Sequence, residues 1–361
     1  MTPNLIPMSR DVVYRILSAG ILLCCVVSSG LAAWVNVTAN LAEMPSECGN
    51  LCLLSVVPGQ DKIIAGIAKQ GLWATSDGGL TWTPLGREAG SDTIVNRPSW
   101  IAFDPAHADV FWESGIYNSF GVYQTTNGGK TFQHLGKITH NDFVSVDFSD
   151  PLRLTLLAGG HEQPRTVWKS VDGGRNWTNV GSNLPPGTKF SSQPLLLGPS
   201  TYVVNASGYG AGAVGVYRTT DGGTTWASVC ALEANGHPLV ATDGTIYWEL
   251  IYDRGIIRST NQGQSWVQGC AYGVIKGAHV IELPDGRLAA VGAKCIKVSS
   301  DKGSSWTPVA EAAPIQAAGL VYSPERQAFF VWQNDCGNKV LTNAIFRYDY
   351  PIGAGRTKPN R

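Results

Sequence analysis

Two histidines and two acidic residues are spaced so that they could form one acid–base site. His140 and Asp142 stand at the start of one apolar run, and His161 and Glu162 follow the end of the next. If the two runs form antiparallel neighbouring strands, the start of the first and the end of the second meet at the same edge. Imidazole and carboxyl groups transfer protons near neutral pH. The spacing therefore predicts a shared site of His140, Asp142, His161 and Glu162.

Further polar and aromatic residues occupy other segments between apolar runs. Glu113 adds a third carboxyl group, and two carboxyl groups across a groove can act as general acid and general base in glycoside hydrolysis. Tyr209 is a further catalytic candidate. Aromatic rings stack on sugar faces and polar side chains bind hydroxyls, which favours a carbohydrate groove. The residues expected to bind substrate are Arg97, Trp100, Tyr117, Asn141, Gln163, Tyr252 and Arg254.

An eight-residue repeat recurs every 40 to 50 residues, roughly the length of one propeller blade. It has Ser or Thr first, Asp or Asn third, Gly fifth and an aromatic residue last. Asp or Asn can fold back onto a tight turn, Gly accepts a positive φ, and the aromatic residue can wedge between blades. We therefore interpret the repeat aspartates as structural. The six repeats are 75–82, 125–132, 170–177, 219–226, 259–266 and 299–306.

Short apolar runs rich in Val, Ile, Thr and aromatic residues precede each repeat, and this pattern is typical of an all-β chain. Three runs and a repeat followed by a fourth strand make one blade, so six repeats predict six blades. Three runs after the last repeat, at 319–322, 328–332 and 344–347, lack a fourth strand. We expect residues 34–38 to supply it beside 344–347, which closes a single seven-bladed β-propeller over residues 34–350.

The repeat resembles the Asp-box (BNR) motif, and the resemblance covers nearly all of the chain after residue 33. Propellers with this motif occur in sialidases, xyloglucan-cleaving glycoside hydrolases, uronate-cleaving polysaccharide lyases, sortilin-type receptors and photosystem assembly factors. The resemblance therefore implies a fold rather than one function. The usual sialidase start, Phe-Arg-Ile-Pro, is absent from the sequence.

The blade that holds the two histidines is similar to the two-histidine blade of propeller polysaccharide lyases. That resemblance implies proton abstraction and carboxylate neutralisation by His140 and His161, with Tyr209 as proton donor and Arg97 or Arg254 as neutraliser. Three functions stay open. The first is hydrolysis of a polysaccharide, which is slightly favoured, the second is β-elimination from a uronate-containing glycan, and the third is a non-catalytic binding or assembly propeller.

The N-terminal segment predicts export. Residues 1–33 place Arg10 and Arg15 before an apolar run that ends in small residues, which is the order of a secretory signal peptide. We therefore expect a secreted or periplasmic protein without stable membrane insertion after signal removal. The tail, 351–361, is polar and expected to be flexible.

The charges balance, with 27 basic and 27 acidic residues, which argues against a nucleic-acid partner. We expect a monomer whose partner is a polysaccharide or oligosaccharide substrate. We expect no cofactor and no metal, because the one close cysteine pair, Cys48 and Cys52, has no second pair at metal-binding spacing.

Six cysteines follow the signal segment, and an even number in an exported chain favours disulfides. Cys230 and Cys270 occupy equivalent places in consecutive blades, as do Cys295 and Cys336 in the last two blades. The predicted bonds are Cys230–Cys270, Cys295–Cys336 and Cys48–Cys52.

Overall fold

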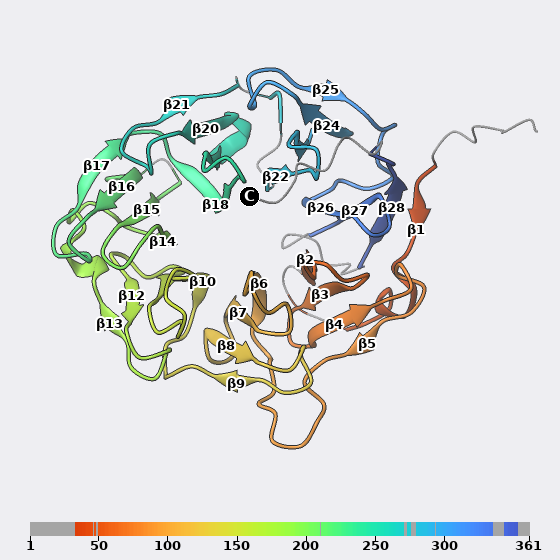
Figure 1. Cartoon of the computed structure of the whole chain (residues 1–361), viewed down its shortest axis with the longest axis horizontal. Helices are drawn as coiled ribbons and strands as arrows, with labels where there is room; N and C mark the ends of the chain where they lie inside the picture. Colours follow the sequence, from red (N-terminus) through yellow and green to blue (C-terminus); the bar gives the residue numbers. More distant parts are fainter. Residues whose placement is uncertain are drawn as a thin grey trace, which may run out of the picture. The chain divides into compact units, whose positions relative to one another are not determined.

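The computed structural model describes residues 33–352 apart from 46, 48, 49, 210, 271, 272, 276–278, 293 and 335–342. Seven four-stranded antiparallel sheets follow one another around a ring (Figure 1). The prediction of an all-β, seven-bladed propeller is therefore confirmed. Besides the strands, the described residues form three short 3-10 helices, namely η1 (Ala39–Leu41), η2 (Gly181–Asn183) and η3 (Ile251–Asp253).

Each blade starts with its innermost strand and ends with its outermost one (Figure 1). The first blade consists of β2 (Leu51–Val56), β3 (Ile63–Ile67), β4 (Gly71–Thr75) and β5 (Thr83–Pro84). The second consists of β6 (Arg97–Phe103), β7 (Phe111–Ile116), β8 (Val122–Thr125) and β9 (Gln133–His134). The third consists of β10 (Asn141–Val146), β11 (Leu156–Gly160), β12 (Val167–Ser170) and β13 (Thr178–Asn179).

The next three blades repeat this order. The fourth consists of β14 (Ser191–Leu196), β15 (Tyr202–Ser207), β16 (Gly215–Thr219) and β17 (Ala227–Cys230). The fifth consists of β18 (Ala234–Val240), β19 (Ile246–Leu250), β20 (Ile256–Ser259) and β21 (Val267–Gln268). The sixth consists of β22 (Ile281–Glu282), β23 (Leu288–Val291), β24 (Ile296–Ser299) and β25 (Thr307–Pro308).

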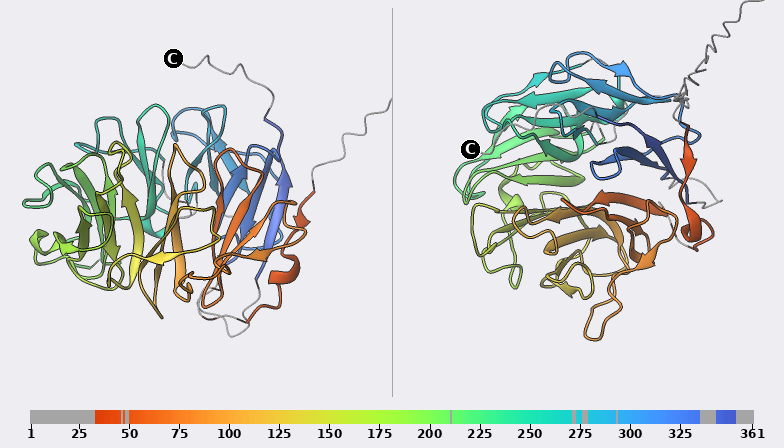
Figure 2. Two further views of the ribbon diagram at one scale, coloured as in Figure 1. Left: turned by 60° about the horizontal axis from the view of Figure 1, so that its bottom comes forward. Right: turned by 45° about the vertical axis from the view of Figure 1, so that its right-hand side comes forward.

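The seventh blade takes strands from both ends of the described chain. Its inner strands are β26 (Gly319–Ser323), β27 (Ala328–Trp332) and β28 (Ile345–Asp349), and β1 (Val35–Asn36) is its outermost strand. Val35 pairs with Arg347, and Figure 2 shows β1 beside β28. The Val37 amide continues the ladder to the Ile345 carbonyl at 2.9 Å. The prediction that 34–38 completes this blade is confirmed.

The apolar core is divided among the spaces between neighbouring blades. Between the seventh and first blades, Val37 and Leu54 pack with Phe330 and Trp332 in one buried cluster. Between the fourth and fifth, Val203 packs with Trp248. Each sheet thus buries both faces against its neighbours, so no blade has a stable core of its own.

The six repeats form the turns between the third and fourth strands of their blades. In the first, Asp77 accepts hydrogen bonds from the Thr81 amide at 3.0 Å and from the Thr81 and Thr75 hydroxyls at 2.6 Å each. Gly79 in the same turn has a φ of +92°. The corresponding hydrogen bonds hold the pKa of Asp221 near 2. These carboxylates are fully used by the turn.

The aromatic residue that ends each repeat packs inward. Trp82 donates its indole N–H to the Val37 carbonyl at 3.1 Å, and Trp226 donates to the Val180 carbonyl of the preceding blade at 3.2 Å. These bonds connect neighbouring blades. Each turn therefore places its aromatic residue between neighbouring blades, as predicted.

The predicted bond between Cys230 and Cys270 is wrong, because both thiols are free. A bulge between Val216 and Tyr217 lets β17 continue as far as Cys230, whereas β21 already ends at Gln268. Cys270 then turns into the buried cluster between the fifth and sixth blades. Equal spacing from the repeat therefore does not place the two sulfur atoms equivalently.

Two further predicted bonds each include a residue outside the described part of the chain, Cys48 in one and Cys336 in the other. Cys295 carries a free thiol. The expected signal peptide, up to residue 32, and the tail from residue 353 also lie outside it. Within the described residues, no helix has the length and apolar character needed to cross a membrane.

Glu113, expected among the catalytic acids, is buried inside its blade. Its side chain is fully inaccessible, and its Oε2 accepts one hydrogen bond from the Asn96 amide at 3.3 Å. Burial raises its pKa to about 8, against the smaller opposing effect of the Asn96 hydrogen bond. Because β7 is buried along its whole length, an acid there does not reach solvent.

The seam between β1 and β28 yields a stability prediction. Val37→Ala should lower the free energy of unfolding by about 2 kcal/mol, because Val37 is only 2% exposed in the cluster that joins the seventh and first blades. Val35→Ala is the matched control, since Val35 is 41% exposed, and should change stability by less than about 0.5 kcal/mol. Chemical denaturation measures both, and equal effects would contradict a buried seam.

Glu113 yields a pH prediction. The unfolded chain ionises this carboxyl near its ordinary pKa, whereas the folded chain keeps it protonated until about pH 8. The stabilising contribution is therefore fully present at acid pH and is lost as pH rises through the folded pKa. Glu113→Gln should become more stable relative to the unsubstituted protein by roughly 4 kcal/mol between about pH 5 and pH 8.

Urea denaturation across this pH range tests the expectation, with the exposed Glu325→Gln as control. A difference between Glu113→Gln and the unsubstituted protein that does not vary with pH would show that the buried carboxyl is ionised in the fold.

Candidate active site

Irregular ladders in four inner strands shape the centre of the ring. In the first, second, third and fifth blades, the register between the first and second strands shifts once. The shifts lie, in that order, at Leu51/Leu53, Pro98/Trp100, Asn141/Val144 and Asn235/Leu239. A bulge turns side chains out of the regular alternation. The residues carried by these four bulges are Cys52, Ser99, Asp142 with Phe143, and Gly236 with His237 and Pro238.

Most of these bulge residues line a central cavity of about 190 Å³. Its wall is polar and includes Asp142, His161 and Glu249, whose side chains can transfer protons. The residues that line it are Cys52, Arg97, Pro98, Ser99, Asp142, Phe143, His161, Gln193, Ser207, Tyr209, Asn235, Gly236, Glu249, His279 and Ala318.

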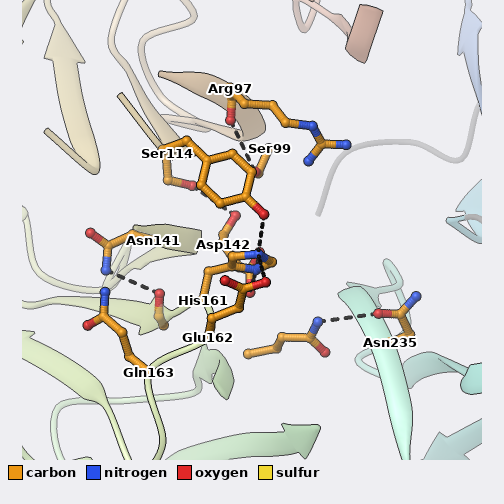
Figure 3. Close-up of polar contacts among 12 residues, drawn as sticks. Arg97, Ser99, Ser114, Asn141, Asp142, His161, Glu162, Gln163 and Asn235 are labelled. Carbon is orange, nitrogen blue, oxygen red and sulfur yellow. Dashed lines mark hydrogen bonds and ion pairs between the residues drawn. The ribbon is translucent and has the colours of Figure 1, made fainter. Parts of the chain in front are cut away.

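Asp142, His161 and Tyr117 form a hydrogen-bonded chain beside the cavity. His161 Nδ1 lies 2.9 Å from Asp142 Oδ1, and its Nε2 lies 3.1 Å from the Tyr117 hydroxyl (Figure 3). With Nδ1 donating to the carboxylate, Nε2 is free to exchange a proton with the phenol. This is the base–orienter arrangement found at many acid–base sites.

The charge environment of His161 favours its protonated form. Burial alone would lower the pKa of this imidazole, but the hydrogen bond and charge of Asp142, with the charge of Glu162, more than offset it. The net effect raises the His161 pKa above its ordinary value. Burial, followed by the Glu162 charge, also raises the pKa of Tyr117, which therefore stays neutral.

The second blade holds Asp142 in place. The Ser114 hydroxyl donates to the Asp142 carbonyl at 3.3 Å and accepts the Val144 amide at 3.1 Å, across the bulge. The bulged backbone, which lacks its regular partners in β11, is thereby satisfied by a neighbouring blade.

Glu249 is a second acid of the cavity wall, and it differs from Asp142 in its surroundings. It lies at the end of β19, is 5% exposed, and its Oε1 has no hydrogen-bond partner. Burial, supported by the Asp253 charge, raises its pKa well above the ordinary value. Burial therefore favours the protonated, neutral form of the Glu249 carboxyl group in the cavity wall.

Aromatic rings from non-adjacent blades meet across the centre of the ring. Trp100, from the second blade, stacks on His237, from the fifth, with ring centroids 3.9 Å apart and planes at 10°. Phe143 lies 5.7 Å from the same imidazole. Burial lowers the pKa of His237 to about 3 and that of His279 to about 4, so both stay neutral. Trp100 therefore packs against His237 and is not among the residues that line the cavity.

His140 and Glu162, also expected at the site, stand at its rim. The ring of His140 lies 5.1 Å from that of Tyr117 and 6.5 Å from that of His161. His140 lines a separate hollow with Phe120. A Glu162 carboxylate oxygen lies 3.7 Å from His161 Nε2. The structure thus brings the four residues of the predicted acid–base site together, but only Asp142 and His161 reach the cavity.

The other expected residues divide between structural and peripheral positions. Asn141 donates to the Gly159 carbonyl at 3.1 Å from a buried position (Figure 3). Gln163 donates to the Thr139 carbonyl at 3.0 Å. Both brace the loops of the third blade. Arg97 does line the cavity.

Tyr209 lines the cavity and remains half-exposed, with its ring 5.0 Å from that of Phe190. Tyr252 donates its hydroxyl to the Tyr209 carbonyl at 3.2 Å, and Arg254 lies over the Tyr252 ring at 5.7 Å. Tyr252 and Arg254 are therefore one layer removed from the cavity.

Backbone strain concentrates at the same rim. Five of the expected residues have a positive φ although none is glycine, a conformation that L-residues rarely adopt. Such strain clusters at functional sites when the surroundings enforce it. The residues and their φ values are Tyr117 at 60°, His140 at 56°, Glu162 at 53°, Tyr209 at 51° and Tyr252 at 59°.

Several cavity residues were not predicted. Glu249 and Glu113 show the same sequence signal, an acid within an apolar strand, but only the three-dimensional fold shows that Glu249 faces the cavity. Gln193 and Asn235, whose side chains lie 3.4 Å apart, gave no sequence signal.

No protein-family model matches the chain. A xyloglucanase from a Paenibacillus species is 26% identical over 220 residues, which is 51% of this chain and 21% of that protein. The match thus spans about a fifth of the relative's length.

Solved structures show the same fold at low identity. The GH74 xyloglucanase from Xanthomonas campestris superposes with a TM-score of 0.56 at 18% identity, covering 84% of this chain and 54% of that one. YCF48 bound to D1 peptide superposes with a TM-score of 0.56 at 16% identity, covering 88% of this chain and 97% of that one. The chain is thus a seven-bladed β-propeller similar in fold to GH74 xyloglucanases.

Proposed function

We propose that the protein is a glycoside hydrolase that cleaves a polysaccharide in the central cavity. One observation carries the proposal, namely that Glu249 and Asp142 line the same cavity in opposite environments. Glu249 is buried with its pKa raised well above the ordinary value, whereas Asp142 is paired with His161. Glycoside hydrolysis requires one protonated and one ionised carboxyl group.

In this mechanism Glu249 is the general acid. It donates its proton to the glycosidic oxygen as the bond to the anomeric carbon breaks. Asp142 faces the positive charge that develops on the sugar ring and acts on it directly or through an activated water. His161 is a positioning residue, since its Nδ1 holds the Asp142 carboxylate and its Nε2 is held by Tyr117.

The comparisons support this choice of reaction. The relative from Paenibacillus is named a xyloglucanase, an enzyme that cleaves a polysaccharide, and the fold is shared with the xyloglucanase from Xanthomonas. The expected signal peptide supports action outside the cytoplasm, where polysaccharides are met. The proposal is therefore a secreted or periplasmic hydrolase that works as a monomer without a metal.

A second candidate is β-elimination from a uronate-containing glycan. It is favoured by the 3.1 Å contact between the Tyr117 hydroxyl and His161 Nε2, with Arg97 on the same cavity. In that reaction His161 or Tyr117 would remove the proton beside a carboxylate, and Arg97 would neutralise the carboxylate.

Hydrolysis is tested with a panel of polysaccharides, measuring new reducing ends together with absorbance of unsaturated uronates. The unsubstituted protein should produce reducing ends alone. Glu249→Gln should lower the rate by roughly 100- to 10,000-fold, because the general acid is lost. Folding should be unaffected, since the glutamine replaces a carboxyl that is already neutral. Glu325→Gln, exposed and away from the cavity, is the matched control.

Other results distinguish the alternatives. Reducing ends with matching uronate absorbance would identify a lyase. No product from any polysaccharide would leave a binding propeller, a role consistent with the structure of YCF48 bound to D1 peptide. Full activity in Glu249→Gln would remove Glu249 from the mechanism.

The positioning role of His161 is tested by NMR titration of its imidazole. Asp142→Asn removes the negative charge that raises the His161 pKa and leaves only a neutral amide oxygen as acceptor, while burial remains, so this pKa should fall from its raised value. Asp92→Asn is the matched control, because the Asp92 carboxylate binds the amide and the exposed imidazole of His134, at 2.8 Å each. It should leave the His161 titration unchanged, and an unchanged titration in Asp142→Asn would rule out the coupling.

A further inference from the structure

The central cavity is small compared with the substrate proposed for it. Its volume of about 190 Å³ lies below the roughly 300 to 1,000 Å³ typical of a pocket that encloses a drug-sized ligand. A polysaccharide bound there must therefore continue across the rim, where at least one further sugar unit contacts the protein. Tyr209 stands at this exit, because it lines the cavity and is also 53% exposed.

The register of the fourth blade places Phe190 beside Tyr209. Ser191, the first residue of β14, pairs with Ser207, the last residue of β15. The residue before β14 and the loop after β15 therefore share one edge of the sheet. The two rings meet edge to face, with centroids 5.0 Å apart and planes at 73°. Phe190 also lies 6.0 Å from the His161 ring, so the two rings continue from the candidate active site onto the rim.

A buried acid from the next blade fixes the loop that carries Tyr209. Glu233 stands directly before β18 and is 4% exposed. Its Oε1 accepts hydrogen bonds from the Ser207 hydroxyl at 3.0 Å and from the Gly208 and Tyr209 amides at 2.7 Å each. The Tyr252 hydroxyl donates to the Tyr209 carbonyl at 3.2 Å. These bonds from both sides enforce the positive φ of 51° at Tyr209.

Tyr209 is thus exposed and yet held in one backbone conformation. An exposed aromatic side chain that is already ordered binds a ligand at a lower entropic cost than a mobile one. The edge-to-face contact with Phe190 covers at most one face of the Tyr209 ring, so the other face is not covered by Phe190.

We propose that the Tyr209 and Phe190 rings form a second sugar-binding subsite, which takes the pyranose unit next to the one in the cavity, and that Glu233 is its positioning residue. This rests on the proposed function and adds the path by which the substrate leaves the cavity. A pyranose has an apolar face of C–H groups that stacks on an aromatic ring. In this role the ring of Tyr209 matters, whereas a proton donor would need its hydroxyl.

Binding tests the proposal in the Glu249→Gln background, so that no product forms during the titration. Isothermal titration calorimetry compares glucose with cellotriose, xylose with xylotriose, mannose with mannotriose and galacturonate with its trimer. At least one trisaccharide should bind more tightly than its monosaccharide. Phe190→Ala and Tyr209→Ala should each weaken that trisaccharide by about 3- to 10-fold, as expected for the loss of a stacking contact. Phe190 is not among the described residues that line the cavity, so Phe190→Ala should leave the monosaccharide unchanged.

Conservative variants separate the ring from its support. Tyr209→Phe keeps the ring and should retain the affinity for the trisaccharide. Glu233→Ala should weaken the trisaccharide about as much as Tyr209→Ala, and combining the two should add nothing, because both act through the same ring. Glu233→Gln keeps an acceptor oxygen and should restore most of the affinity. Leu80→Ala, which removes a 69% exposed side chain from a repeat turn, is the matched control and should bind like the background protein.

Three results would overturn the subsite: no trisaccharide binds more tightly than its monosaccharide, Phe190→Ala and Tyr209→Ala keep the advantage of the trisaccharide, or Tyr209→Phe loses it. Additive effects of Glu233→Ala and Tyr209→Ala would overturn the positioning role. Thermal unfolding verifies that each variant is folded.

Failure of the proposed hydrolysis looks different. A trisaccharide advantage that Phe190→Ala removes, without cleavage by the unsubstituted protein, would remove the hydrolase and keep the subsite. Cleavage of a polysaccharide with a KM that Phe190→Ala does not change would keep the hydrolase and remove the subsite.

Discussion

The structure depends on the need of every sheet for two neighbours. A single blade is apolar on both faces, so it is stable only when flanked on each side, and seven blades satisfy this condition only as a closed ring. The contact between β1 and β28 meets the condition for the last blade. The Trp82 indole adds to it, because its hydrogen bond to Val37 ties the closing segment to the first blade. The central cavity exists because the ring is closed.

Within that ring, the stabilising repeat turns and the candidate reactive groups lie at opposite ends of the strands. The carboxylates of the repeat turns accept hydrogen bonds within their own turns, which holds the pKa of Asp221 near 2. Four of the inner strands are regular at that end and bulged at the other, where Asp142 leaves the ladder and is held instead by Ser114. The fold can therefore place reactive groups at the bulges without weakening the contacts between blades.

Local patterns were sufficient to predict the fold, because the repeat fixes a turn, a spacing and a wedge. They also predicted the proximity of His140 and His161, which follows from antiparallel pairing. They did not distinguish Glu113 from Glu249, since both are acids in apolar strands and only packing decides which one lines the cavity. They also failed for Cys230, because a bulge is not visible in the spacing of residues. Residues brought together across the ring, such as Trp100 and His237, have no local signal at all.

The pairing of β1 with β28 also determines when the ring can close relative to synthesis of the chain. Thr38 and Ile345, whose hydrogen bond helps close the ring, stand 307 residues apart in sequence. The segment that is synthesised first thus waits for its partner until nearly all of the remaining blades have been made. Until then the outer edge of the last blade has no strand to cover it, and the first blade lacks the seventh blade as its second neighbour. Ring closure is therefore a late step that follows synthesis.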